Sequence, residues 1–354
     1  MIGSTLGRYR IIEQLGTGGM AVVYKGYDPF MDRMVAIKTV APQIVNQPDF
    51  VERFRREAKL LAALTHPNIL AIFDYAEESG NCYLVTQLVE GDSLADRIRN
   101  GLLPLLDTSR ILTQIASALD FAHNQNIFHR DIKPSNILLD QHDRVFVTDF
   151  GIARMMEGLF VQTFGVMLGT PQYMSPEQCQ GKPVVTAVSD IYSLGIVLFE
   201  MLTGALPFQA ETPMAVLLKQ INEPLPSLRS KGRDLPLSIE RVIFKAMAKE
   251  PEHRYQSAGA MAEALAQAVR EYDETLLRQP DDKGVPLFNI LQAHFDVEEF
   301  RTLCFELGVN YDNLRGEGLA PKMRELIAYC QRRNQVEKLI TMIKQERPSI
   351  DMDG

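Results

Sequence analysis

The sequence has none of the segments that direct a protein into or across a membrane. Residues 1–8 contain neither the apolar core of about 7–15 residues nor the small-residue cleavage site of a secretion signal. No run approaches the roughly 20 apolar residues that span a bilayer. The longest, at residues 191–199, ends at Glu200 and is interpreted as a buried helix. We therefore expect a soluble, cytoplasmic protein without a membrane span.

Cysteines are also few, and basic residues are outnumbered by acidic ones. The four cysteines, Cys82, Cys179, Cys304 and Cys330, show no Cys-x-x-Cys spacing. A long chain without a secretion signal favours reduced, mostly buried thiols over disulfides. The 37 Lys and Arg are outnumbered by 45 Asp and Glu, which gives a formal net charge of −8. Because no basic surface dominates this balance, nucleic acid is not expected as a main partner.

The overall composition is that of an ordinary globular protein. Of the 354 residues, 46% are hydrophobic and 23% are charged, which excludes a mainly disordered or fibrous chain. At roughly 100 to 200 residues a domain, this length predicts two domains or three small ones. The sequence contains no internal repeat and no low-complexity run.

A glycine-rich segment near the start suggests a phosphate site. Strands are predicted at residues 10–15 and 22–25, with Gly16-Thr17-Gly18-Gly19-Met20-Ala21 between them. Glycines allow a tight turn and let backbone amides approach phosphate oxygens, although most such hairpins are only turns. The next predicted strand, residues 34–40, carries Lys38 in an apolar run. A lysine there either reaches out to solvent or is held by a buried anion.

The helix predicted after this strand helps to decide between the two alternatives for Lys38. From residue 50 onward, Phe54, Ala58 and Leu61 recur at helical spacing and define an inward stripe, on which Glu57 also falls. A carboxylate that faces the core needs a cation, and Lys38 is the candidate. The alternative is that Glu57 lies at the edge of the stripe, in water.

Three polar residues of the middle region suggest a metal site. An amphipathic helix predicted at residues 111–122 leads to Asp131 and Asn136, and a strand that follows ends at Asp149. Functional side chains concentrate at such loop positions. Two acids and an amide suit Mg²⁺, which takes oxygen ligands and shares them with phosphates. Each residue alone is more often a turn or cap residue, but the ordered set has no purely structural interpretation.

With these motifs in order over about residues 9–270, the sequence resembles a protein kinase of the bacterial branch of eukaryotic-type Ser/Thr kinases. The resemblance implies an α+β, bilobal fold with a small β-rich lobe and a larger helical lobe, here at residues 9–272. It implies transfer of the ATP γ-phosphate to protein hydroxyls, with Mg²⁺ or Mn²⁺ as the metal. Asp131 would accept the hydroxyl proton, and Lys133 with Thr170 would mark the Ser/Thr type.

The same resemblance assigns the remaining site residues. Lys38, oriented by Glu57, would hold the α- and β-phosphates, and Asn136 and Asp149 would bind the metal. The residues implied in ATP binding are Leu15, Gly16, Thr17, Gly18, Gly19, Met20, Ala21, Val22, Val23, Ala36, Lys38, Gln87, Val89 and Leu138. Two departures are mild: Ala21 replaces the third glycine of the loop, and Ser175 replaces the alanine of Ala-Pro-Glu.

Further positions take supporting roles in this resemblance. Arg254 would pair with Glu177, Asp190 would anchor the catalytic loop from a buried helix, and Thr86 would be the gatekeeper next to the hinge. His129 is interpreted as packing behind the Phe150 ring rather than as an acid or base.

Thr163 is predicted to be the activation-loop phosphosite. It is the only hydroxyl between Gly151 and Gly169, and a phosphate there could order the loop against Arg130. The segment is also unusually apolar, so the alternative is a loop that packs against the cleft or a second molecule and needs no phosphate. Thr170 is a poorer candidate because its implied role is substrate docking.

The last part of the chain is predicted to be a separate helical domain. A linker is predicted at residues 273–286. Helical stripes follow from Phe288, with Asp296 as an N-cap and Pro321 in a first turn. Residues 287–354 resemble the bacterial effector-associated or death-like domains. The resemblance implies an all-α, death-fold-like bundle that pairs with like domains. The alternative is a helical cap packed on the kinase.

Three other functions are weighed against a kinase with an interaction domain. An ATP-binding signalling scaffold, whose helical tail is the functional part, is the main alternative. A pseudokinase is disfavoured because every catalytic residue is present. A small-molecule kinase is disfavoured because Gly169-Thr170-Pro171 and Ser175-Pro176-Glu177 resemble a peptide-docking segment.

Overall fold

The structure is a computed structural model that describes ten stretches of the chain. They are residues 1–18, 21–47, 49–78, 80–151, 170–182, 186–232, 235–278, 284–314, 318–333 and 335–347, with only the backbone described at 273–278, 284–286 and 332. The chain divides into two compact units, Met1–Ala266 and Gln267–Gly354.

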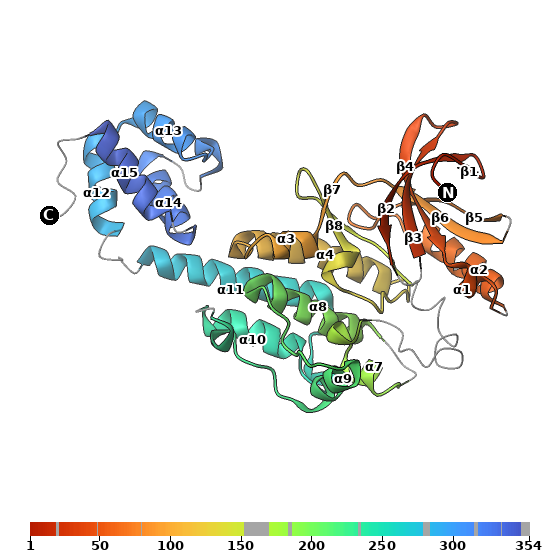
Figure 1. The fold of residues 1–354 in the computed structure, drawn as a ribbon. Helices are drawn as coiled ribbons and strands as arrows, with labels where there is room; N and C mark the ends of the chain where they lie inside the picture. The colour runs from red at the N-terminus through yellow and green to blue at the C-terminus, as the bar shows by residue number, and fades with distance from the viewer. Residues whose placement is uncertain are drawn as a thin grey trace. The chain divides into compact units, whose positions relative to one another are not determined.

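The first unit begins with an antiparallel six-stranded sheet in the order β1-β2-β3-β4-β6-β5 (Figure 1). Its strands are β1 Thr5–Leu6, β2 Tyr9–Thr17, β3 Ala21–Asp28, β4 Arg33–Val40, β5 Ile72–Glu78 and β6 Asn81–Gln87. Two helices, α1 Pro42–Val45 and α2 Phe50–Ala62, accompany this sheet. The three strands predicted in this region are confirmed.

Side-chain alternation along β4 positions the functional lysine. Val35 and Ile37 are completely buried in the core of the sheet. Successive side chains of a strand point to opposite faces, so Lys38 projects from the other face. On α2, Phe54, Glu57, Ala58 and Leu61 are all buried. This confirms the inward stripe, and with 4% exposure Glu57 does not lie in water at its edge.

The rest of the first unit is mainly helical. Its helices are α3 Leu94–Arg99, α4 Leu105–His123, α7 Pro176–Cys179, α8 Ala187–Thr203, α9 Pro213–Asn222 and α10 Leu237–Ala246, and α11 Ala258–Arg278 begins in this unit and ends in the second. Short 3-10 helices lie at η1 Pro134–Asn136, η2 Pro171–Tyr173, η3 Arg229–Lys231 and η4 Pro251–His253. A small sheet of β7 Gly91–Ser93, β8 Ile137–Asp140 and β9 Val145–Val147 carries the segments around the catalytic loop.

The long apolar run lies in α8, where residues 191–199 are all buried. The helix is therefore surrounded by protein, as predicted. Among the described residues, none of the helices combines the length and the apolar character needed to cross a membrane. The four cysteines are free thiols, three of them buried and Cys179 partly exposed, which confirms the prediction of reduced thiols.

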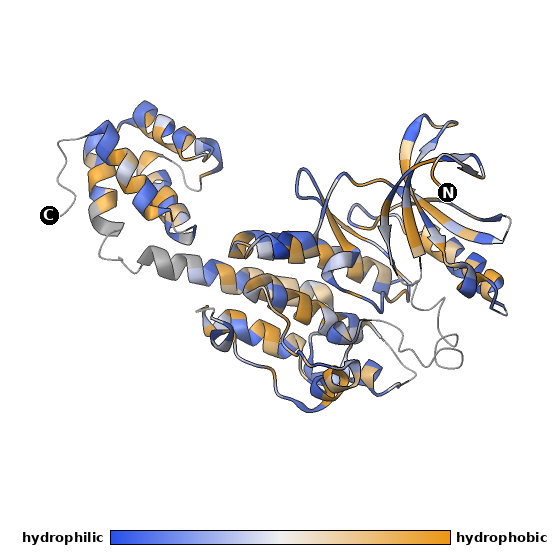
Figure 2. Ribbon diagram, viewed as in Figure 1, coloured by the Kyte–Doolittle hydropathy of each residue, from blue (hydrophilic) through white to orange (hydrophobic). Residues whose placement is uncertain are grey.

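The second unit contains a bundle of short helices. They are α12 Gly284–His294, α13 Val297–Glu306, η5 Tyr311–Asn313, α14 Leu319–Arg332 and α15 Val336–Glu346. Their apolar faces form one core that includes Leu291, Phe300, Met323 and Leu339, and Figure 2 shows hydrophilic residues on the outer sides of these helices. Asp296 caps α13 by accepting a 2.9 Å bond from the Glu299 amide, as predicted.

The boundary between the two predicted domains needs a correction. The helix expected to end near Tyr272 continues to Arg278 as α11, and α12 already begins at Gly284. Residues 273–278 are helical because they contain no glycine or proline, and Pro280 is the first residue that stops a helix. The predicted linker at 273–286 is therefore helical at both ends, and residues 279–283 lie outside the described part of the chain.

Candidate active site

A cavity of about 500 Å³ lies between the six-stranded sheet and the helical part of the first unit. Leu15, Val23 and Ala36 line it from the sheet, and Leu138 lines it from β8. The segment after β6 contributes Val89. Apolar walls with a few polar groups at one end are typical of ligand pockets, and this slot suits a flat ring.

The predicted ATP-binding residues divide into three groups. Those that line the cavity are Leu15, Gly16, Val23, Ala36, Lys38, Gln87, Val89 and Leu138. Thr17, Gly18, Ala21 and Val22 are described but are not among the lining residues, because they belong to the hairpin tip, which a 2.8 Å bond from the Gly18 amide to the Ala21 carbonyl closes. Gly19 and Met20 lie outside the described residues.

The cavity is also lined by Leu61, Leu64, Ile69, Leu84 and Phe150, which the sequence did not predict as cavity residues. Thr86, the predicted gatekeeper, lies on the wall as well. For Leu61, the inward stripe of α2 was a signal. The other residues come from separate segments that meet only in the fold.

Lys38 is paired with the predicted metal ligand. Its ammonium lies 2.7 Å from Oδ1 of Asp149. Desolvation tends to raise the pKa of Asp149, but the adjacent Lys38 charge and its hydrogen bond outweigh it, and the net shift is downward. Asp149 is therefore held as a carboxylate.

Glu57 is paired differently from the prediction. Its Oε1 lies 3.2 Å from the Arg56 guanidinium, whereas Lys38 bonds Asp149. Between the described residues Lys38 and Glu57 there is no ion pair in this conformation. The Lys38–Glu57 ion pair stays a prediction for an active conformation.

The catalytic loop brings the predicted base and its partners together. Asp131 Oδ2 lies 2.7 Å from the Lys133 ammonium and accepts a 3.1 Å bond from the Asn136 amide nitrogen. Lys133 also donates to the Thr170 hydroxyl at 3.0 Å. The carboxylate, the lysine and Thr170 of the predicted docking segment are thus connected by direct bonds.

Asn136 and Asp149 have the chemistry that a hard cation requires. Both hydrogen bonds of the Asn136 side chain use its amide nitrogen, which leaves its carbonyl oxygen as the atom for a metal. No group of three or more His, Cys, Asp or Glu side chains suited to a metal occurs in the described ranges. A Mg²⁺ ion here would therefore share its coordination with phosphate oxygens, as Mg²⁺ commonly does.

The backbone before Asp131 is anchored from the buried helix α8. Asp190 accepts bonds from the amides of His129 at 2.8 Å and Arg130 at 2.7 Å, as predicted. The His129 ring lies 4.7 Å from the Phe150 ring, and its Nε2 bonds the Thr148 carbonyl at 2.7 Å. The interpretation of His129 as a packing residue is therefore confirmed.

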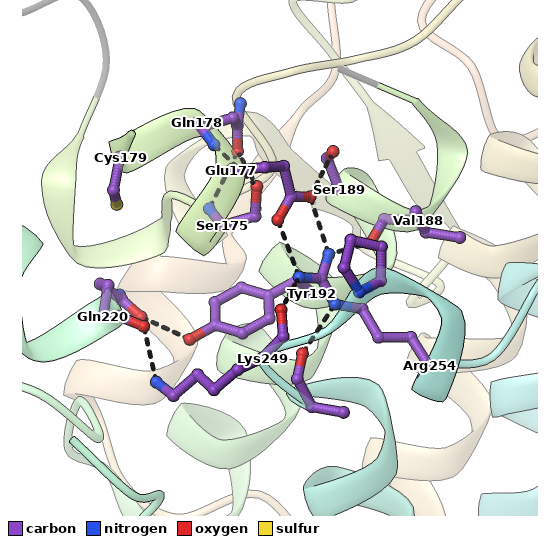
Figure 3. A network of polar contacts seen from close by, with 12 residues as sticks. Ser175, Glu177, Gln178, Cys179, Val188, Ser189, Tyr192, Gln220, Lys249 and Arg254 are labelled. Atoms are coloured by element: carbon purple, nitrogen blue, oxygen red, sulfur yellow. Dashed lines mark hydrogen bonds and ion pairs between the residues drawn. The ribbon is translucent and has the colours of Figure 1, made fainter. Parts of the chain in front are cut away.

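A second network stabilises the segment that follows the predicted activation loop. Arg254 holds Glu177 through two parallel 2.8 Å bonds, as predicted, and the Ser189 hydroxyl donates to the same carboxylate at 2.7 Å (Figure 3). Desolvation alone would raise the pKa of Glu177. The bonds from Arg254 and Ser189 have the larger effect and lower this pKa to about 2. Nearby, Gln220 accepts from the Tyr192 hydroxyl. Thr163, the predicted phosphosite, lies outside the described residues.

Family comparisons agree with both predicted resemblances. The family described as protein kinase domain matches residues 9–268, and the family described as effector-associated domain 7 matches residues 287–348. The crystal structure of the Mycobacterium tuberculosis PknI kinase domain is similar, with a TM-score of 0.62 at 27% identity. That likeness covers 76% of this chain and 98% of the other.

Similar curated proteins are bacterial kinases that are longer than this chain. Serine/threonine-protein kinase PrkC of Bacillus subtilis is 44% identical over 263 residues, which are 74% of this chain and 40% of that protein. Serine/threonine-protein kinase PknA of Mycobacterium tuberculosis is 40% identical over 276 residues, with coverage of 76% and 63%. The chain thus spans only part of the length of these relatives. It belongs to the protein kinase domain family, and an effector-associated domain follows its kinase domain.

Proposed function

We propose that this chain is an ATP- and Mg²⁺-dependent Ser/Thr protein kinase whose C-terminal domain associates with like domains. The bonds that join Asp131, Lys133 and Thr170 carry the proposal. They place a carboxylate next to the segment where a peptide hydroxyl would arrive. A lysine on the same carboxylate can stabilise negative charge that develops on a transferred phosphoryl group.

Each residue has a defined part in this reaction. Asp131 orients the attacking hydroxyl and accepts its proton, which requires an ionised carboxylate. Lys38 would hold nucleotide phosphates, and Asn136 and Asp149 would hold Mg²⁺, or Mn²⁺ in its place. Bound metal neutralises charge on the phosphates. Catalysis then depends on alignment and on charge stabilisation by these fixed groups.

The test is transfer of labelled γ-phosphate from ATP to a generic protein substrate. Wild-type protein is expected to label the substrate, and the Asp149→Ala variant is expected not to do so. A wild-type signal no higher than that of this variant would favour the ATP-binding scaffold. The presence of Lys38, Asp131 and Asp149 in bonded positions argues against that alternative.

The C-terminal domain is expected to fold alone. A fragment of residues 282–354 retains the apolar core of the second unit, although small domains have modest stability. Circular dichroism of the fragment should show a helical spectrum with cooperative melting. A coil spectrum would instead indicate a cap that needs the kinase surface.

If this domain associates with its own kind, it also raises the local concentration of kinase domains. Removal of the tail should then lower autophosphorylation at low protein concentration and change it little at high concentration. Equal loss at both concentrations would point to a direct effect on the kinase domain.

Phosphorylation of Thr163 is expected after incubation with ATP and Mg²⁺. The new group carries about −1.5 to −2 charges and can bond arginine. Arg130, directly before Asp131, is the proposed receiver, so loop order and base position would change together. Mass spectrometry would locate the phosphate, and Thr163→Ala should lower the rate. An unmodified Thr163 with an undiminished rate for Thr163→Ala would favour hydrophobic packing of the loop.

A further inference from the structure

We infer that Gln220 is a positioning residue for the segment that docks the protein substrate; this inference rests on the kinase function proposed above. Gln220 lies near the end of α9 and is completely buried. Its Nε2 donates a 2.7 Å hydrogen bond to the main-chain carbonyl of Gln172. Gln172 is the middle residue of η2, the turn that follows Thr170 in the predicted docking segment. A side chain 48 residues away in the sequence therefore holds the backbone of this segment.

The orientation of the Gln220 amide follows from its two partners. A main-chain carbonyl can only accept a hydrogen bond, so the amide nitrogen must face Gln172. The amide oxygen then faces Tyr192 of α8 and accepts a 2.7 Å bond from its hydroxyl (Figure 3). Burial raises the pKa of Tyr192, so this hydroxyl keeps the proton that it donates. The amide is thus bonded at both ends and cannot turn without losing a partner.

Gln220 is also fixed through its own backbone, because a proline removes the usual helical donor. If α9 continued, the carbonyl of residue 220 would accept from the amide of residue 224. That residue is Pro224, which has no N–H. The ammonium of Lys249 takes the place of this donor, 2.6 Å from the Gln220 carbonyl oxygen (Figure 3). The side chain that reaches Gln172 therefore starts from a fixed point of the backbone.

The docking segment joins this network to the catalytic residues. The Thr170 hydroxyl accepts a 3.0 Å bond from Lys133, and the same ammonium lies 2.7 Å from Asp131. A peptide that docks here needs this backbone in one conformation, since a preorganised surface avoids the cost of ordering on binding. Gln220 is not among the residues that line the ATP cavity. It should therefore affect the binding of the protein substrate and not that of ATP.

The first test is Gln220→Met, which keeps the length of the side chain and removes its amide. The adjacent Tyr173 carbonyl keeps its 2.7 Å bond from Ser193, so the segment should loosen without unfolding. The full chain is assayed with dephosphorylated casein as the protein substrate. KM for casein should rise about three- to tenfold, the range for one lost hydrogen bond, while KM for ATP should stay within about twofold of the wild type.

Asn222 provides a matched control on the same helix. Its side-chain amide bonds the Leu218 carbonyl at 3.1 Å, within α9. Asn222→Ala also removes a bond from a side-chain amide to a main-chain carbonyl, and it should leave both KM values near those of the wild type. If it raised KM for casein as much as Gln220→Met, a general disturbance of α9 would explain the effect and the inference would be wrong.

A double variant covers the case in which Gln220→Met does not fold. Removal of the amide alone leaves the buried Tyr192 hydroxyl without its acceptor, which is costly. Gln220→Met with Tyr192→Phe removes acceptor and donor together and is compared with Tyr192→Phe, in which Gln220 can still donate to Gln172. KM for casein should be about three- to tenfold higher in the double variant. Equal values would overturn the inference.

A further measurement does not depend on activity. The Tyr173 amide bonds the Thr170 carbonyl at 2.9 Å in the same turn. Its hydrogen exchange should be about three- to tenfold faster in Gln220→Met than in the wild type, because the turn opens more often, and unchanged in Asn222→Ala. If the wild type did not phosphorylate casein, the proposed kinase function would fail, while the exchange rates would still decide whether Gln220 holds the segment.

Two results for Gln220→Met contradict the inference. One is unchanged exchange of the Tyr173 amide together with an unchanged KM for casein. The other is a lower kcat with both KM values unchanged, because a residue that only stabilises the fold changes the amount of active enzyme and not its affinity for the protein substrate.

Discussion

Replacement of Lys38 by methionine is expected to lower phosphoryl transfer by about two to three orders of magnitude, the usual loss when a group that stabilises developing charge is removed. Methionine has a similar length and no charge. Its side chain would leave the phosphates and Asp149 without their ammonium partner. Because the Lys38 side chain is partly exposed rather than fully buried, the fold should tolerate the change. Steady-state kinetics and circular dichroism of the variant would measure both effects.

Lys25 provides a matched control for this experiment. It lies on the neighbouring strand β3, its side chain is 28% exposed against 23% for Lys38, and it pairs with Glu13 at 3.6 Å. Lys25→Met removes a strand lysine of similar exposure away from the cavity, and it should leave the rate near that of the wild type. Near-native turnover of Lys38→Met would show that the assignment of Lys38 is wrong.

Arg254→Met should destabilise the kinase domain by about 3–5 kcal/mol, as expected when one partner of a buried ion pair is removed. The Arg254 side chain is completely buried, and its loss would strand the Glu177 carboxylate in the interior. The double variant Arg254→Met with Glu177→Gln removes that stranded charge and should recover part of the loss. Chemical denaturation of the three proteins would measure the free energies of unfolding.

An exposed ion pair offers the comparison for Arg254. Arg110 bonds Asp143 at 3.0 Å on the surface, and such pairs contribute about 0–1 kcal/mol. Arg110→Met should therefore change the free energy of unfolding only slightly. If it destabilised the protein as much as Arg254→Met, burial of the Glu177 pair would not be the cause.

The same ion pair predicts a dependence of stability on pH. The pKa of Glu177 is about 2 in the folded protein, below its ordinary value of roughly 4.3 in an unfolded chain. A carboxylate whose pKa is lower in the folded protein stabilises the fold at every pH above its unfolded-state pKa. This contribution is lost as pH falls from about 4 toward 2. It is worth about 3 kcal/mol at neutral pH. The double variant should lack this part of the acid sensitivity.

The periodic patterns of apolar residues made the helices and strands predictable, and also the inward orientation of the Glu57 side chain. An apolar stripe fixes which face of a helix is buried, and strand alternation fixes the side on which Lys38 projects. The Arg254–Glu177 and Asp190 contacts were implied by resemblance to a known family, since the residues of each pair are far apart in sequence.

Other features depended on geometry that a sequence does not encode locally. The pairing of Lys38 with Asp149 rather than Glu57 depends on the three-dimensional placement of residues that are far apart in the sequence. The cavity wall formed by Leu64, Ile69, Leu84 and Phe150 is assembled from separate segments.

Thr86 has a consequence for pharmacology. Its short side chain lies on the wall of a cavity that is also lined by Val89, Leu64 and Ile69. A synthetic inhibitor with a flat ring and an apolar extension could therefore fill the space next to Thr86. A bulkier residue at position 86 would reduce that space and weaken such an inhibitor without touching the groups that carry out catalysis.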